Sequence, residues 1–312
     1  MSFGRVAFIF SMIIVAGTAF LVWSGYDFLT QEFPDVSVLR NQYPVVEYHS
    51  TDKTSQIKLQ PAPPTGWVGL ESVSKTAVGA IIVSEDWAFF QHKGYDPNQI
   101  REAIKDDWAL GKLHRGASTI TQQVVKNVFL DNDKNLWRKA KELVLAVRLE
   151  NSVPKKKILE TYLNVAEWGD GIYGINAASQ HYFKKAPSEL TAREGAFLAM
   201  LLPSPKRYNQ SFKSRQMSEY ANKTVKSILT KMESAKYITE EQLKEDLNAR
   251  YWFENEGVPG STTITEEVGT SAPAETATEE IQTQKKPPFP PPVPPEDAVD
   301  PHPETPGAPV SL

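Results

Sequence analysis

The sequence of 312 residues contains no cysteine, which excludes disulfides, thiolate metal sites and a cysteine nucleophile. Its five histidines show no HExxH or other paired-ligand spacing. It also has no G-x-S-x-G elbow and no Walker loop. Zinc-protease, serine-hydrolase and P-loop chemistry are therefore not expected. The formal net charge of −4 gives no reason to expect nucleic acid as a partner.

Charged residues are also missing from one long stretch, residues 6–23. An apolar run of this length is about the shortest that spans a bilayer core as a helix. Arg5 precedes it and Asp27 follows it, so the positive-inside rule puts the N-terminus in the cytoplasm. A cleaved signal peptide is the alternative, but no clear small-x-small site follows the run. We expect a cytoplasmic N-terminus at 1–5 and a transmembrane anchor at 6–26.

The rest of the chain divides by composition. Residues 27–75 contain scattered prolines and are expected to form a stalk, with one short strand at 45–48 and little other regular structure. Residues 257–312 are rich in Thr, Glu, Ala and Pro. They cannot bury enough apolar surface to offset chain entropy, which predicts a disordered, extended tail. The folded domain is then expected at 76–250.

Helix signals recur in this domain, whereas strand signals are scarce. Thr191 and Glu194 have the spacing of a capping box, and Pro154 can open a helix. Two apolar stripes have helical spacing: Ile158, Leu159, Tyr162 and Leu163 form one, and Leu136, Ala140, Leu143, Val144 and Val147 form the other. The expected fold class is mainly α.

The first stretch that could carry chemistry is SEDWAFFQHKGYD, residues 84–96. Ser84 is expected to cap a helix whose first turn contains Glu85 and Asp86. Acids in a first turn commonly do no more than favour the helix dipole. The functional interpretation is a carboxylate beside apolar aromatic residues, where its pKa can rise so that it moves protons.

The second stretch covers residues 115–127. Thr119 and Gln122 again have capping-box spacing. Gln122, Gln123 and Lys126 follow Thr119 on one helical face. Hydroxyl, amide and ammonium groups near a helix N-terminus can hold an anion, although a solvated polar face would have the same pattern.

The third stretch, residues 138–150, places Glu142 on one helical face with Arg138 and Lys139. The simple interpretation is a surface salt bridge, which contributes under about 1 kcal/mol. The functional interpretation is a carboxylate held inside a cationic pocket that grips phosphates.

The fourth stretch covers residues 155–183. A helix is expected to end near Asn164, and the glycines at 169, 171 and 174 are expected to make a tight loop. Glycine-rich loops usually only turn the chain, but Glu167 and Asp170 in this region could contribute to a site.

In this order, the stretches resemble the peptidoglycan glycosyltransferase family (glycosyltransferase family 51) over about residues 75–215. The matches are Glu85, Asp86, Phe89, His92 and Gly94 for ED-x-x-F-x-x-H-x-G; Gly116, Ser118, Thr119, Gln122, Gln123, Lys126 and Asn127 for G-x-S-T-x-x-Q-Q-x-x-K-N; Arg138, Lys139 and Glu142 for RK-x-x-E; Tyr162, Leu163 and Asn164; and residues 193–205.

One apolar span and no following transpeptidase domain resemble the monofunctional branch of the family. The acidic, Pro-rich tail departs from the family pattern, and so do residues 206–210, which lack the proline often found after the aromatic residue.

The resemblance implies a lysozyme-like domain with a small membrane-facing jaw. It also implies a polymerase that acts on lipid II. The growing glycan is the donor, still attached to its lipid diphosphate. The GlcNAc 4-hydroxyl of a new lipid II attacks the donor's anomeric carbon, with inversion to a β-1,4 link and release of undecaprenyl diphosphate.

This chemistry needs a base for the attacking hydroxyl, and Glu85 is the expected catalytic base. Glu142 is the second catalytic carboxylate that the resemblance implies, and it could hold the cations, a metal or the sugar. The leaving diphosphate needs charge stabilisation. The expected substrate-binding residues are Ser118, Gln122, Gln123, Lys126, Arg138 and Lys139, and the expected supporting residues are Asp86, His92 and Asn164.

A divalent cation such as Mg²⁺ or Mn²⁺ could help to stabilise the diphosphate, and no organic cofactor is expected. The implied partners are lipid II, the growing glycan strand and the membrane. Cell-wall synthesis proteins are candidates to bind the tail. The implied location is the bacterial cytoplasmic (inner) membrane, with the catalytic domain on the periplasmic side.

Two alternatives remain open from the sequence. A lytic transglycosylase or muramidase would cut finished glycan and would not need a cationic site that binds a diphosphate. An inactive membrane scaffold would act through its Pro-rich tail, which the intact carboxylates and cations argue against.

Overall fold

The computed structural model describes residues 3–102, 118–131 and 135–254. The expected tail at 257–312 and the glycine at 116 lie outside these described residues.

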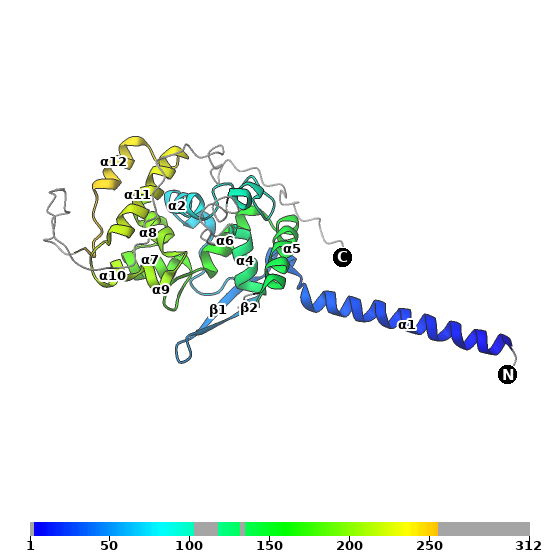
Figure 1. The fold of residues 1–312 in the computed structure, drawn as a ribbon. Helices are drawn as coiled ribbons and strands as arrows, with labels where there is room; N and C mark the ends of the chain where they lie inside the picture. The colour runs from blue at the N-terminus through cyan, green and yellow to red at the C-terminus, as the bar shows by residue number, and fades with distance from the viewer. Residues whose placement is uncertain (1–2, 103–117, 132–134, 255–312) are drawn as a thin grey trace, which may run out of the picture.

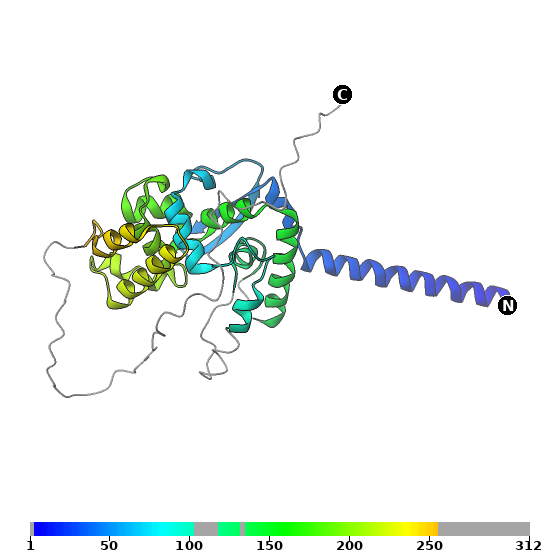
Figure 2. The ribbon, with the colours of Figure 1, turned by 90° about the horizontal axis from the view of Figure 1, so that it is seen from above.

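A single long helix extends away from the body of the protein. This helix, α1 (Phe3–Glu32), projects from the body in both views (Figures 1 and 2). Judged by length and hydropathy together, no helix among the described residues qualifies as a membrane span. The anchor at 6–26 therefore stays a prediction.

The segment expected to be a stalk has more regular structure than its prolines indicate. It contains the 3-10 helix η1 (Val36–Arg40) and a second 3-10 helix, η2 (Leu70–Ser72). Between them the antiparallel strands β1 (Tyr43–His49) and β2 (Thr54–Gln60) form a hairpin. The strand expected at 45–48 is present within β1, but the expectation of little other regular structure is wrong. Val36, Leu39, Leu70 and Val73 are buried, because this segment packs on the helical body.

A buried helix organises the body. The helix α2 (Lys75–Glu85) packs against α8 (Ala192–Leu201) and α11 (Glu219–Ser234). Every residue of α8 is buried, and so is every residue of α2 from 77 to 83. A helix that is apolar on all sides belongs in the interior. This packing fixes the position of the C-terminal end of α2, where Glu85 lies.

Three further helices pack together, with α4 (Ile120–Phe129) in contact with both α5 (Leu136–Ser152) and α6 (Lys155–Val165). They lie next to one another in Figure 1. The predicted capping box at the start of α4 is confirmed, and so is the one at the start of α8. The apolar stripe predicted on α6 is buried throughout.

The stripe predicted on α5 faces solvent instead. Leu136 is 90% exposed, and Leu143 and Val144 are also exposed. The buried residues of α5 are Glu142, Leu145, Ala146, Leu149 and Glu150. The spacing predicted correctly which residues share a face, but the core covers the opposite face.

The remaining elements complete the body. They are β3 (Glu167–Gly169), β4 (Ile172–Tyr173), α7 (Ile175–Phe183), η3 (Pro187–Glu189), α9 (Pro205–Tyr208), α10 (Gln210–Lys213) and α12 (Glu240–Asn248). The described protein is mainly helical, which confirms the expected fold class.

Aromatic side chains attach the residues after α12 to the body. The Tyr251 hydroxyl donates to the carbonyl oxygen of Arg193 at 3.0 Å, and the Arg193 guanidinium lies 4.6 Å from the Tyr251 ring centroid. The Trp252 indole N–H donates to the carbonyl oxygen of Tyr182 at 2.6 Å. These contacts hold the end of the described chain against α7 and α8.

The close contact between α8 and α2 gives a stability prediction. A Cβ at Gly195 would lie 2.5 Å from the Cα of Ala77. Backbone atoms cannot move aside easily, so the extra methyl of Gly195→Ala is expected to lower the free energy of unfolding by about 1–3 kcal/mol. Thermal unfolding measures this loss. The matched control is Gly25→Ala, since nothing lies within 4 Å of a Cβ there. Equal melting temperatures for the two variants would contradict the prediction.

Candidate active site

The first candidate carboxylate lies at the end of a helix, not at its start. Ser74 is the N-cap of α2, and Asp86 is its C-cap. The expectation that Ser84 caps a helix is therefore wrong, because the apolar residues before it form that helix. Glu85 is the last residue of α2, where the carbonyl end of the helix dipole disfavours a negative charge.

The Glu85 carboxylate is partly buried and hydrogen-bonded to α4. The Gln123 amide nitrogen donates to its Oε2 at 2.8 Å. Burial raises the pKa of the Glu85 carboxyl above its usual range, and Asp86 adds to the rise, whereas Gln123 and Lys126 oppose it. A carboxylate with a raised pKa is better matched to accepting a proton near neutral pH.

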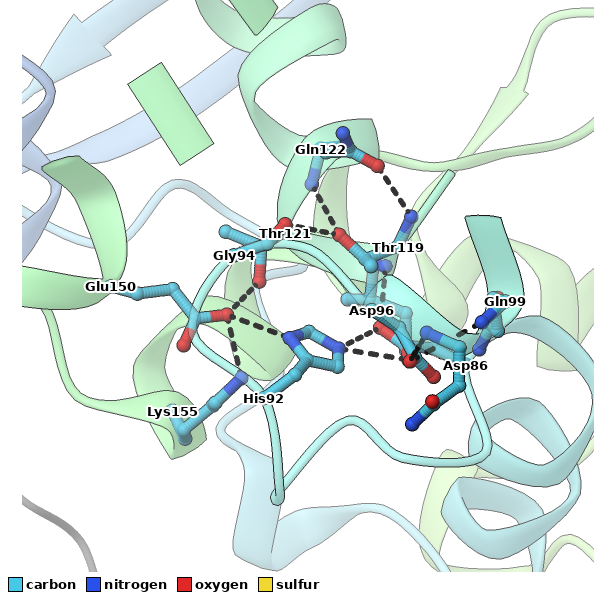
Figure 3. A network of polar contacts seen from close by, with 12 residues as sticks. Asp86, His92, Gly94, Asp96, Gln99, Thr119, Thr121, Gln122, Glu150 and Lys155 are labelled. Atoms are coloured by element: carbon cyan, nitrogen blue, oxygen red, sulfur yellow. Dashed lines mark hydrogen bonds and ion pairs between the residues drawn. The ribbon is translucent and has the colours of Figure 1, made fainter. Parts of the chain in front are cut away.

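Asp86 fixes the start of α4 (Figure 3). It is fully buried, and both of its carboxylate oxygens lie 3.0 Å from Nε2 of His92. The backbone N–H of Ile120, in the first turn of α4, donates to Asp86 at 2.9 Å. A carboxylate at a helix N-terminus satisfies an unpaired backbone donor there. Asp86 and His92 thus hold α4 against the end of α2, which is a supporting arrangement.

The loop that carries His92 is fixed by a glycine. Gly94 has a φ of +91°, and a Cβ there would lie 2.8 Å from the backbone of Ala146 in α5. The Thr119 hydroxyl donates to the Gly94 carbonyl at 2.8 Å. Only a glycine has both the conformation and the space that this close approach needs.

Glu150 and Lys155 are buried network residues that sequence reasoning missed (Figure 3). The Thr121 hydroxyl and the Lys155 ammonium donate to Oε1 of Glu150 at 2.5 and 2.6 Å. Nδ1 of His92 lies 3.8 Å from the same oxygen. The network therefore joins α4, α5 and α6. Its members are far apart in sequence, so no local spacing pointed to them.

Glu142 is the centre of a cationic cluster on α5. Its side chain is 2% exposed. Arg138 donates to Oε2 at 2.9 Å, and Lys139 donates to Oε1. The Lys139 ammonium also donates to the Ser118 hydroxyl at 2.8 Å. Burial distinguishes this cluster from a surface salt bridge, because a buried carboxylate needs such partners to stay charged.

Lys126 links the two carboxylates electrostatically. Its side chain is exposed, yet desolvation of the ammonium lowers its pKa, and Arg138 and Lys139 lower it further. Glu142 and Glu85 act in the opposite direction. Lys126 is therefore within electrostatic range of both Glu85 and the α5 cluster. An anion bound at this point would relieve the repulsion among the three cations.

Comparison with known proteins agrees with this arrangement. The transglycosylase family (Transgly) matches residues 53–233. The chain belongs to this family. The biosynthetic peptidoglycan transglycosylase of Brucella suis biovar 1 (strain 1330) is 44% identical over 155 residues, which is 50% of this chain and 69% of the relative.

Two relatives with the same name come from Nitrosomonas eutropha and Nitrosospira multiformis. They are 39% and 38% identical over 170 and 171 residues, which cover 54% and 55% of this chain and 68% and 73% of the relatives. The resemblance found in the sequence is thus confirmed.

Two expected site residues of this transglycosylase have local structural contacts. Gln122 accepts from the backbone N–H of Thr119 at 2.9 Å and so caps its own helix. The Asn164 amide donates to the carbonyl oxygens of Val68 and Glu160, both at 2.8 Å. Asn164 therefore ties the segment before α2 to α6. No described contact joins it to Glu85 or Glu142.

The acids of the glycine loop also lie apart from the transglycosylase site. Glu167 and Asp170 lie 3.5 and 3.6 Å from the Lys206 ammonium, and Asp170 also lies 3.7 Å from Lys53. The predicted tight loop is present as the turn between β3 and β4, with Gly171 at a φ of +74°. Its acids pair with exposed lysines, with no described contact to the α5 cluster.

A divalent cation stays a prediction for this family member. No group of three or more His, Asp or Glu side chains converges among the described residues. Both oxygens of Glu142 already accept from Arg138 and Lys139. This donor set does not fit a resident metal ion, which prefers several free oxygen ligands.

Proposed function

We propose that this chain polymerises lipid II into β-1,4-linked glycan strands of peptidoglycan. The observation that carries the proposal is the pairing of a partly buried Glu85 with a cluster of cations that Lys126 connects to it. The names of the relatives support peptidoglycan synthesis as the activity. The positions of Glu85 and the cations support a transfer reaction with a charged leaving group.

In the proposed reaction Glu85 accepts the proton of the attacking GlcNAc 4-hydroxyl. The new bond forms between that oxygen and the anomeric carbon of the donor. The bond from the anomeric carbon to the lipid diphosphate breaks, and its electron pair leaves with the diphosphate. The leaving group needs no proton, only positive charge. Lys126, Arg138 and Lys139 are the proposed source of that charge.

Glu142 is proposed to hold the cations in place. Its burial and its two hydrogen bonds fix Arg138 and Lys139 side by side. Without it, two like charges would repel at this spacing. The Lys139 side chain is 46% exposed, so it can still meet an incoming anion.

The test is a polymerisation assay with the purified full chain and lipid II. Glycan polymer on a gel supports the proposal. Digestion of purified sacculi without any polymer from lipid II would favour a lytic enzyme. If deletion of residues 257–312 abolished function in cells while Glu85→Gln left it intact, a scaffold role for the tail would be favoured.

We propose that the protein is attached to the bacterial cytoplasmic membrane by α1, with its catalytic domain on the periplasmic side. Trp137 and Lys141 of α5 donate to Glu32 at the end of α1 at 3.0 and 2.9 Å. The exposed apolar face of α5 therefore starts where α1 meets the body. An apolar patch at this place supports contact with lipid.

Leu136→Glu tests this orientation. Leu136 is 90% exposed, so its loss cannot disturb packing. A charge at a membrane-facing position is expected to lower polymerisation about threefold to tenfold when lipid II is in vesicles, and to have no effect in detergent. The control is Leu59→Glu on the exposed strand β2. A Leu136→Glu enzyme that is equally active in vesicles would contradict the orientation.

A further inference from the structure

Glu85 is connected to α6 through one amide. Gln123 donates to Oε2 of Glu85 at 2.8 Å. The carbonyl oxygen of the same amide accepts from the Tyr162 hydroxyl at 3.3 Å. Tyr162 is fully buried, so the chain of hydrogen bonds begins in the core and ends at the carboxylate.

The direction of this chain follows from the chemistry of its members. An ionised carboxylate can only accept hydrogen bonds, so Gln123 must present its NH₂ group to Glu85. The amide oxygen then faces Tyr162. Two acceptors cannot bond, so Tyr162 must donate. One tyrosine hydroxyl thereby determines which end of the amide faces the catalytic carboxylate.

Tyr162 is suited to act as a permanent donor. Burial raises the pKa of its hydroxyl well above the usual range, and the charges of Glu85 and Asp86 raise it further. It therefore keeps its proton near neutral pH. Its ring is also part of the buried stripe of α6, which leaves it little freedom to move.

We infer that Tyr162 is a positioning residue for the transfer reaction, acting through Gln123 to hold Oε2 of Glu85 as a hydrogen-bond acceptor. This inference rests on the proposed function. Among the described residues, the hydrogen bond to Glu85 falls on Oε2 alone. The second oxygen, Oε1, is then the atom that takes the proton from the attacking hydroxyl.

The hydrogen bond from Gln123 also affects how activity depends on pH. The charged and titratable groups facing Glu85 are Asp86 at the end of α2, Lys126 on α4 and Tyr162 on α6. The Gln123 hydrogen bond favours the ionised carboxylate and lowers the Glu85 pKa. If the amide loses its orientation, this effect is lost and the Glu85 pKa rises. Activity would then start to fall at a higher pH as acid is added.

The experiment uses full-length Tyr162→Phe, Gln123→Leu and the double variant, with lipid II as substrate. Tyr162→Phe is expected to lower kcat about threefold to tenfold with little change in KM. It should also shift the acid limb of the pH profile to higher pH. Gln123→Leu should do the same to a larger extent. The double variant should match Gln123→Leu, because Tyr162 acts only through that amide.

The matched control is Tyr182→Phe. Tyr182 is also fully buried, and its hydroxyl donates to the Trp168 carbonyl at 2.8 Å, away from Glu85. It should leave the pH profile unchanged. Additive losses in the double variant, or a Tyr162→Phe profile identical to that of Tyr182→Phe, would overturn the inference.

A second measurement separates this inference from the proposed function. Carbon-13 NMR of the glutamate carboxyls, with Glu85 assigned from Glu85→Gln, reports the Glu85 pKa of the full chain in detergent without any substrate. A higher Glu85 pKa in Tyr162→Phe than in wild type supports the hydrogen-bond chain, even if no polymer forms. An unchanged Glu85 pKa rejects it, even if the wild type polymerises lipid II.

Discussion

Glu85→Gln is expected to make no detectable polymer from lipid II, with a rate at least about 10²–10⁴-fold below wild type. The amide has the size of the carboxylate but cannot take the proton of the attacking hydroxyl. The wild-type rate should fall as acid is added, beginning above the pH at which an ordinary glutamate titrates, because the Glu85 pKa is raised. This limb should be absent from any residual activity of Glu85→Gln.

The contribution of Glu85 to stability should depend on pH in a different way from its contribution to activity. Since the pKa of Glu85 is raised in the folded state, the folded protein binds more protons than the unfolded chain between the ordinary and the raised pKa. Stability from this group therefore falls as pH rises through that window. Above it, Glu85→Gln should melt at the same temperature as wild type or higher. Glu240→Gln, a surface glutamate paired with Lys244, is the matched control for activity. Polymer from Glu85→Gln at the wild-type rate would reject Glu85 as the base.

Local signals predicted local structure well. The capping boxes at Thr119 and Thr191 involve atoms three residues apart, so the sequence contains all the information that they need. The same holds for the helix after Pro154. The motif residues pointed to the family, and the matched domain confirms that membership.

Burial could not be predicted from spacing. The stripe that begins at Leu136 has the period of a core face, but the protein buries the face containing Glu142. A buried carboxylate is rare unless it is paired, and its partners Arg138 and Lys139 lie within one turn of it. Spacing alone is equally compatible with a surface pair, so only the packing of α5 decides between the two.

Contacts between residues far apart in the chain could not be predicted from the sequence either. Asp86 accepts from the backbone of Ile120, 34 positions later, and Glu150 accepts from Thr121, 29 positions earlier. Such contacts depend on how the helices cross. They explain why the two neighbouring acids have different roles. Asp86 accepts from the N-terminus of α4, whereas Glu85 accepts from the side-chain amide of Gln123.

The site therefore has a fixed part and an exposed part. Asp86, His92 and Glu150 are buried and hold α4 and α5 in register. Lys126 is exposed on α4, and Lys139 is exposed on α5. Buried networks that position exposed charges suit a site that stabilises a transient anion, because the cations do not have to reorganise when the charge develops.

Lys126→Met is the second change expected to have a large effect, because it removes a cation that interacts electrostatically with both carboxylates. Loss of one positioned charge at a developing anion is expected to lower kcat about 10²–10³-fold. The fold should not suffer, since desolvation and the nearby Arg138 and Lys139 already disfavour this charge. Lys126→Met should therefore melt at or above the wild-type temperature.

The control for Lys126→Met is Lys244→Met, an exposed lysine on α12 whose side chain is 67% exposed. It should polymerise lipid II like wild type. Lys126→Arg keeps the charge and should recover part of the lost rate, which a purely steric effect of Met would not allow. If Lys126→Met kept more than about half of the wild-type kcat, positive charge at α4 would not be what stabilises the leaving diphosphate. A lytic enzyme releases no diphosphate, so its digestion of purified sacculi should not depend on this charge. Measuring Lys126→Met in both the polymerisation and the sacculus-digestion assay therefore separates the two reactions by the charge of their leaving groups.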